Sequence, residues 1–391
     1  MNHEVVVTGV GLVSSAGVGN AAHLDAMCAP APQPVVDSSR HAPMTVHPTP
    51  EIDWNLQIPR REQRQMELWQ KLGVYGAGLA LEHAGIKDNA ELCKSMDMII
   101  AASGGERDLA VDAEIIARVK AGGEPGEVIN AVLTTELRPT LFLAQLSNLL
   151  AGNISIVHKV TGSSRTFMGE ESAGVSALKI ASDRIRAGQS THALVGASYN
   201  GEDADYLLSY ALEGLLKRDG WQPVWARTGD AGLITGSGAA FLVIESHAHA
   251  QARGATILAV LGPVHESRNR RPDAQTFCKL LSSAANAATP ELVISGASGH
   301  APALAHERAA LALYPDTPVR AFGSLTGHMK EAQFLFAAGL AALCVAEGRT
   351  PSPVGDERAA PARAPVAVLA EMVGILRGEG AVMLRKPEAG S

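Results

Sequence analysis

The spacing of apolar residues along this chain predicts strands that lead through turns into helices. Apolar runs at 4–8, 96–102 and 163–168 are short enough for buried strands, and helical spacing follows the last two, at 107–120 and from 170 onward. Similar runs recur later in the chain, at 256–261, 291–295, 318–321, 366–370 and 380–384. Buried strands that alternate with helices predict an α/β fold of mixed sheets covered by helices.

The segment 147–198 shows this pattern most clearly. A strand at 163–168 is followed by a tight turn at Gly169, a long helix that Gly188 ends, and a second strand at 193–197. This places Glu170 and Glu171 at the helix start, where free backbone N–H groups and the helix dipole favour negative charge. A cysteine at such an elbow would be a low-pKa nucleophile. Here the elbow carries carboxylates instead.

Two other kinds of segment are predicted by composition and spacing. Leu68, Leu72 and Leu79 keep helical spacing within a predicted helix at 62–85. The stretches 29–50 and 351–365 are rich in proline and are expected to be surface connections.

The composition excludes several classes of protein. With 391 residues and 46% hydrophobic content, the chain is expected to form one large domain or two closely packed ones. A net charge of −7 without any Lys/Arg block argues against nucleic acid as a partner. The longest nearly apolar run, 332–346, is too short to span a membrane.

The cysteines and glycines give no sign of a metal or cofactor. The four cysteines have neither metal-ligand nor paired spacing, so we expect a reduced cytoplasmic protein without a metal; they are Cys28, Cys93, Cys278 and Cys344. Gly9 and Gly11 follow a strand, but Ser14 occupies the third glycine position of a dinucleotide fingerprint. No cofactor is therefore expected.

Short motifs occur in order over the whole chain. They are V-V-V-T-G-x-G at 5–11, N-x-x-A-G at 148–152, T-G-S-S at 161–164, A-L-V-G-A at 193–197, and G-S-G-A-A-F-L-V-I-E at 236–245 with A-R-G-A at 252–255. Together they resemble the β-ketoacyl-acyl-carrier-protein synthases of the thiolase-fold family. The resemblance implies five layers, αβαβα, built from two similar halves at 1–250 and 251–391.

The resemblance also implies a Cys-His-His catalytic set, which this chain does not keep. The cysteine position falls on Glu171, the first histidine on Ala297 and the second on His328, while the basic residue before the second histidine falls on Gly323. His300 would replace the first histidine only in a shifted loop register. The glycine-rich gating loop corresponds to 374–379 and keeps only part of its glycine pattern. We therefore expect His328 to be a core residue rather than a catalyst.

These losses are typical of one branch of the family, the chain-length factors, which form heterodimers with an active ketosynthase in type II polyketide systems. The resemblance thus predicts an inactive subunit, with an active ketosynthase and an acyl carrier protein as partners and with a role in setting chain length. An aryl-polyene system is the preferred setting. Two alternatives stay open: a malonyl-carrier-protein decarboxylase, and a stand-alone synthase whose nucleophile has moved, with Cys278 and Cys344 as candidates.

The resemblance also implies which residues form the acyl tunnel and the dimer interface. The strand at 165–168 is expected to pair across the interface, and the tunnel end is expected to come from the helix after Gly105 and the segment before Asn148. Ordinary core packing is the alternative for the apolar members of this set. The candidates are Gly105, Leu109, Ile115, Ile116, Phe142, Leu146, Arg165, Phe167, Met168 and Glu171.

Overall fold

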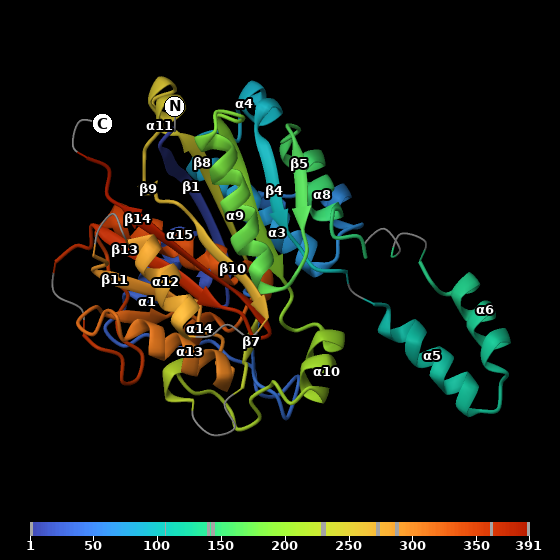
Figure 1. Ribbon diagram of the computed structural model, residues 1–391. Coiled ribbons are helices and arrows are strands. Elements are labelled where there is room, and N and C mark those ends of the chain that lie inside the picture. The colour runs from blue at the N-terminus through green and yellow to red at the C-terminus, as the bar shows by residue number, and fades with distance from the viewer. Residues whose placement is uncertain are drawn as a thin grey trace.

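A computed structural model describes residues 3–105, 107–138, 141, 145–227, 232–270, 274–285, 289–359 and 363–388. Phe142 lies outside these described residues. Two sets of strands form the framework, and helices lie against both faces of each set (Figure 1). No helix within the described ranges is both long enough and apolar enough to cross a lipid bilayer.

The first set of strands comes from the first 246 residues. In spatial order the strands are β1 (Val5–Ser14), β8 (Gly238–Ser246), β6 (His192–Tyr199), β4 (Asp97–Ala101) and β5 (Ser164–Phe167). The β1–β8 and β8–β6 pairs are antiparallel, whereas β6–β4 and β4–β5 are parallel. Helices α3 (Leu68–His83) and α8 (Leu149–His158) pack on this set. Strand β5 is the last strand at its edge of the sheet.

The second set comes from the rest of the chain. Its order is β12 (Val319–Ala321), β11 (Leu292–Ser295), β13 (Ala367–Val373), β14 (Arg377–Arg385) and β9 (Ala259–Leu261), and β10 (His265–Arg270) also pairs with β14. Helices α12 (Ala274–Ala284) and α13 (Ala301–Leu311) pack on it. Because β9 pairs with both β14 and β1, the two sets join in one hydrogen-bonded sheet.

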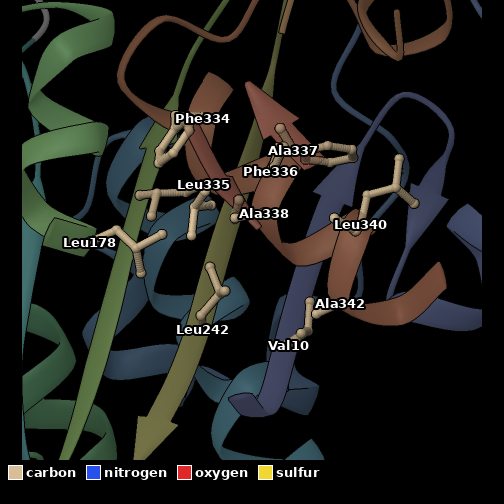
Figure 2. Packing of buried hydrophobic residues seen from close by; sticks show 14 of the residues in the cluster. Val10, Leu178, Leu242, Phe334, Leu335, Phe336, Ala337, Ala338, Leu340 and Ala342 are labelled. Carbon is tan, nitrogen blue, oxygen red and sulfur yellow. The ribbon is translucent and has the colours of Figure 1, made fainter. Parts of the chain in front are cut away.

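Helices α9 (Glu171–Arg186) and α15 (Gln333–Glu347) form the layer between the two sets. They contact each other, and each contacts strands of both sets. Every residue of α15 from Gln333 to Val345 is buried, as expected for a helix that is apolar all round. Figure 2 shows Leu335 facing Leu178 of α9, and Ala342 beside Val10 of β1. The arrangement gives five layers, as the resemblance implied.

A helical hairpin, α5 (Leu109–Lys120) with α6 (Pro125–Thr135), extends away from this body (Figure 1). Both helices begin with a side-chain cap, because Asp108 accepts a hydrogen bond from Val111 N and Glu124 accepts one from Glu127 N. Only Val111 of α5 and Val132 of α6 are buried. The hairpin therefore keeps most of its apolar side chains outside any core of this chain.

The remaining elements are short and connect the layers. They are β2 (Gly17–Val18), α1 (Asn20–Met27), β3 (Val46–His47), η1 (Trp54–Leu56), α2 (Arg60–Gln63), α4 (Ala90–Ser95), α10 (Ala204–Leu212), η2 (Val224–Ala226), β7 (Thr235–Gly236), α11 (His247–Ala252), α14 (Gly323–Thr326) and η4 (Lys330–Ala332).

Several predicted elements differ from the structure. The strand predicted at 4–8 is longer, because β1 continues through Gly9 and Gly11 to Ser14 and pairs with β8 along this length. The helix predicted at 62–85 is two helices, α2 and α3, because Glu67 and Gln70 form a capping box that starts α3. The proline-rich stretch 29–50 is not wholly a surface loop, since Val46 and His47 are buried and pair with β7. In the run 256–261 only Ala259–Leu261 is a strand.

Candidate functional site

The turn between β5 and α9 is a strained elbow. Gly169 has a φ of 135°, and Glu170, the N-cap residue of α9, has a φ of 59° and a ψ of −145°. A non-glycine residue in such a conformation costs roughly 1–3 kcal/mol, which the surrounding structure must offset. The turn directs Glu171 into the protein, where it is 1% exposed. The sequence predicted both this turn and the helix after it.

Glu171 and His328 form a buried pair. The Glu171 Oε1 atom lies 2.9 Å from His328 Nε2. The backbone of His328 is fixed on both sides, because its N–H donates to the carbonyl of Ile234 and its own carbonyl accepts from Gly236 N, at 2.8 and 3.0 Å. His328 is 2% exposed. The pair thus closes within one chain, because His328 supplies the partner of Glu171 Oε1.

The two consecutive glutamates of the elbow differ in their electrostatics. Burial raises the pKa of Glu171, but the hydrogen bond and charge of His328, a backbone hydrogen bond and the charge of Lys330 together lower it by more, so the pKa lies below its ordinary value. Burial, together with the charge of Glu171, raises the pKa of Glu170. The elbow therefore favours an ionised Glu171 beside a Glu170 that holds its proton more readily.

A second polar group joins the elbow to the end of β4. Lys330, which has a φ of 46°, donates from Nζ to Ser103 Oγ over 3.0 Å, and Ser103 donates to the buried carboxylate of Glu331. The Lys330 ammonium also lies 4.6 Å from the ring centre of Tyr206 on α10, and the Tyr206 hydroxyl donates to Gly104 O. Burial is the main cause that raises the pKa of Tyr206 to about 12. Sequence reasoning missed this group, although Lys330-Glu331 is a charged pair directly before an apolar run.

The position of the first family histidine is apolar. Ala297 is 1% exposed and packs in a cluster with Val224, Leu304 and Ala321. A side chain at Gly323 would approach within 3.2 Å of the Ala297 carbonyl, so these two degenerate positions are neighbours. His300 is the N-cap residue of α13. The position that the resemblance assigns to the first catalytic histidine is therefore filled by a small apolar side chain within a buried cluster.

The segment that corresponds to the gating loop lies against the elbow. Gly374 N donates to Gly378 O over 2.8 Å and closes the turn between β13 and β14. Gly378 has a φ of 83°, and a Cβ there would lie 2.5 Å from that of Ser172 in the first turn of α9. Ile375 is 7% exposed. The loop thus packs on the start of α9 through close backbone contact.

Several of the predicted tunnel and interface residues lie at the surface of this chain, whereas Glu171 is buried. Leu109, Ile116 and Leu146 are 45%, 54% and 39% exposed, so core packing does not account for them. Gly105 borders a hollow of about 420 Å³ at the base of the hairpin. On the edge strand Arg165 is exposed and Phe167 is half-buried, and Met168 just after it is 66% exposed. Ile115 is half-buried.

Neither alternative cysteine lies at a helix elbow. Cys344 is buried inside α15, and burial raises the pKa of its thiol, which disfavours the reactive thiolate. Cys278 lies within α12 and is half-buried beside Tyr314. Among the described residues, no three His, Cys, Asp or Glu side chains group in a way that would hold a metal ion.

Five layers around two buried central helices, with an elbow at the start of one of them, define a thiolase-like α/β fold, and solved structures agree. The ishigamide ketosynthase/chain length factor superposes with a TM-score of 0.80 at 19% identity, covering 99% of this chain and 100% of that one. A β-ketoacyl synthase from Burkholderia phymatum matches equally, with a TM-score of 0.80, 19% identity and the same coverage. A chain from the structure of a type II polyketide synthase acyl-carrier protein in complex with its ketosynthase superposes with a TM-score of 0.76 at 19% identity. The match covers 99% of this chain and 100% of that one.

Residues 2–250 match the family described as β-ketoacyl synthase, N-terminal domain, and the chain belongs to this family. It is 23% identical over 267 residues to 3-oxoacyl-[acyl-carrier-protein] synthase 2 of Vibrio cholerae, covering 66% of this chain and 61% of that protein. It is 26% identical over 270 residues to nodulation protein E of Rhizobium leguminosarum bv. trifolii, covering 66% and 62%. The matched part thus spans less than two thirds of these relatives.

Proposed function

We propose that this chain is the chain-length-factor subunit of a type II polyketide synthase and has no condensing activity of its own. The observation that carries the proposal is the buried Glu171–His328 pair, in which a carboxylate occupies the position implied for the nucleophilic cysteine. A carboxylate cannot form the thioester through which a synthase holds its acyl chain. An aryl-polyene system remains the setting that we prefer.

Two surfaces support a role as one half of a heterodimer. Strand β5 ends the sheet, and the α5–α6 hairpin exposes apolar side chains that include Ile116 and Ile129, at 54% and 42%. We propose that an active ketosynthase covers both surfaces, and obligate interfaces of this kind commonly bury more than about 2,000 Å². An acyl carrier protein would deliver the chain to that active subunit.

The proposed tunnel end is the hollow beside Gly105. Side chains of both helices of the hairpin line it, including Val111 and Leu133. Their bulk would limit the length of the chain that the active partner can hold. The proposed location is the cytoplasm, which the four cysteines support because all of them are free thiols.

The two enzymatic alternatives have less support. Decarboxylation in this family relies on two histidines, and residue 297 is an alanine within an apolar cluster. A relocated nucleophile is disfavoured because Cys344 is buried and Cys278 lies in the middle of α12. We therefore retain the non-catalytic subunit as the proposal.

Intact-mass spectrometry tests the absence of covalent chemistry. The purified chain is incubated with acyl and malonyl carrier proteins, alone and together with an active type II ketosynthase. We expect acyl adducts on the ketosynthase and none on this chain. When incubated by itself, this chain should release no CO₂ from malonyl carrier protein. An acyl adduct on this chain would contradict the proposal, and CO₂ release would favour the decarboxylase.

Light scattering during size-exclusion chromatography tests the assembly. We expect one species with the mass of a 1:1 complex when the two chains are produced together. A stable, well-folded monomer of this chain that ignores the ketosynthase at micromolar concentration would refute the heterodimer.

A further inference from the structure

Two of the buried carboxyl groups in the C-terminal half lie near each other and apart from the elbow. Glu307 on α13 and Glu371 on β13 are both 0% exposed. The Ser295 hydroxyl donates to Glu307 Oε1. Glu307 Oε2 and both carboxyl oxygens of Glu371 accept no hydrogen bond from the described residues. The Ser295 hydroxyl, whose one proton goes to Glu307, also lies close enough to lower the pKa of Glu371. A buried carboxylate without donors is costly, so this arrangement needs something to satisfy three oxygen atoms.

A proton shared between the two groups would satisfy two of these three oxygen atoms and would remove one of the two buried charges. Glu307 and Glu371 are each other's hydrogen-bonding neighbours, and two carboxyl groups can make that bond only if one of them is protonated. Burial, followed by the charge of Glu307, raises the pKa of Glu371 well above its ordinary value, and burial also raises the pKa of Glu307.

The surrounding charges do not replace this proton. Arg308 lowers the pKa of Glu307, but its effect is smaller than that of burial. The α15 residue nearest to the segment beside the pair is Gln333, which is neutral. The ionisable groups on the other packed elements are His300 at the N-cap of α13, His306 and Arg308 on α13, Arg320 on β12, Arg377, Glu379 and Arg385 on β14, and Cys278 and Lys279 on α12.

Hydrogen bonds connect the pair to the segment that carries Ala297. Ser295 Oγ, which donates to Glu307, accepts from Ala297 N over 3.0 Å. Gly296 N donates to the backbone carbonyl of Glu371 over 2.8 Å, and Gly296 O accepts from Gln333 Nε2 over 3.2 Å. The Gln333 side chain also accepts from Met329 N, next to His328. The carboxyl pair is therefore tied to the segment 295–297 through the Ser295 hydroxyl, while the backbone of β13 and the Gln333 amide hold Gly296.

We propose that Glu307 and Glu371 share one proton, and that this proton latches the segment 295–297 to the body of the C-terminal half. When the proton leaves to solvent, two carboxylates remain buried side by side, and their repulsion and desolvation loosen the segment. The latch does not depend on the proposed function, since it acts within one chain.

The direction of the pH effect follows from the raised pKa values. The folded chain holds the shared proton more tightly than the unfolded chain does, so the contribution to stability is complete below the ordinary glutamate value of 4.5. It is lost as the pH rises through the folded value. The latch is therefore closed in acid and opens toward alkaline pH.

The variant Glu371→Gln tests the latch, because an amide donates to Glu307 at every pH. Melting temperatures are measured between about pH 5 and pH 9. We expect the wild-type melting temperature to fall relative to that of the variant, so that the variant melts about 2–4 °C higher at the alkaline end. Asp316→Asn is the matched control, since the Asp316 side chain is 94% exposed, and it should follow the wild type.

Two further measurements keep the test decisive. Trp225 packs on the cluster that contains Ala297, so its fluorescence should change with pH in the wild type but not in Glu371→Gln. Hydrogen exchange at the Ala297 amide of the wild type needs no variant, and we expect its protection to fall as the pH rises, after correction for intrinsic exchange. Unchanged protection would overturn the latch, even if Glu371→Gln failed to fold.

A cation is the other group that could satisfy these oxygens. Melting of the wild type is therefore compared in potassium chloride, magnesium chloride and tetramethylammonium chloride at equal ionic strength. The latch predicts equal stability in all three salts. Stabilisation by a metal cation that is absent from Glu371→Gln would show that a cation occupies the site and would overturn the shared proton.

Discussion

The central pair α9–α15 and the hairpin α5–α6 are both pairs of packed helices, but they bury their apolar side chains very differently. Strands lie on both sides of the central pair, and α15 is buried continuously from Gln333 to Val345. The hairpin helices have each other as their main contact and bury one residue each, Val111 and Val132. Apolar content alone therefore does not decide burial; the neighbours that the topology supplies decide it.

This difference has a functional meaning. Helices in proteins gain most of their stability by packing an apolar face, and an exposed cluster of apolar side chains is typical of a surface that another molecule covers. Capping at Asp108 and Glu124 stabilises the ends of the hairpin helices, but it buries no side chain. We therefore expect substitutions in the hairpin to weaken the binding of a partner, and substitutions in the central pair to lower the stability of the folded chain.

The largest effect is expected in the central pair. Phe336 is 0% exposed and stacks on Phe322 with ring centres 4.8 Å apart. Phe336→Ala should lower the free energy of unfolding by about 3–5 kcal/mol, because it removes packing and leaves a cavity. Denaturant unfolding of the single chain measures it. The control is Leu313→Ala, whose side chain is 45% exposed and which should change stability by less than about 1 kcal/mol. Equal losses of unfolding free energy in the two variants would show that the central pair is not more important for stability than the exposed surface.

A smaller effect is expected at the start of α9. Glu171→Gln keeps the shape of the side chain but removes the charge that His328 stabilises, so it should cost roughly 1–3 kcal/mol near neutral pH. The pKa of Glu171 is lower in the folded chain than its ordinary value of 4.5, so its contribution is present above that value and is lost as the pH falls. Denaturant unfolding at neutral and acidic pH should show the difference between variant and wild type shrinking in acid. A difference that is the same at both pH values would show that the charge of Glu171 is not involved.

The elbow also shows how far sequence reasoning reached. The strand, the turn at Gly169 and the helix from Glu171 were predictable because glycine and apolar spacing mark them locally. That His328 meets Glu171 was not predictable from spacing, because the contact joins residues 157 positions apart. The Glu307–Glu371 pair was missed for the same reason, since isolated glutamates give no local signal of burial.

The outer elements were harder to predict. Helix α6 was not predicted, because it makes its side-chain contacts with α5 rather than with a sheet and buries only Val132. The short pairing of Val46 with Thr235 depends on a contact across most of the N-terminal half, and a proline-rich stretch hides it. The five layers themselves came from the resemblance rather than from the alternation of strands and helices.

For the hairpin, the expected effect is on assembly rather than on folding. The double variant Ile116→Glu with Leu133→Glu should change the stability of the isolated chain by only about 0.5 kcal/mol per site, because both residues are already partly exposed. Its dissociation constant from the ketosynthase should rise at least about tenfold, equivalent to about 1.4 kcal/mol. Titration by light scattering or calorimetry measures it. Leu313→Glu, away from the hairpin, is the control, and unchanged affinity in the double variant would exclude the hairpin from the interface.

The smallest energetic effect, and the sharpest test of the tunnel, is expected at Leu109. This residue begins α5 directly after Asp108, which lines the hollow at the base of the hairpin, but Leu109 itself is not a lining residue. It is 45% exposed, so Leu109→Ala should change stability by no more than about 0.5 kcal/mol. A core residue would instead cost about 2–5 kcal/mol. If the hollow ends the partner's tunnel, less bulk there should shift the products of the reconstituted pair toward longer chains, which mass spectrometry of carrier-protein-bound products would detect. Ile129→Ala is the matched control, because Ile129 is 42% exposed on α6 and its neighbours in the chain, residues 128 and 130, do not line that hollow. Unchanged chain lengths from an intact Leu109→Ala heterodimer would mean that Leu109 does not limit the tunnel and that the exposed face of the hairpin serves assembly alone.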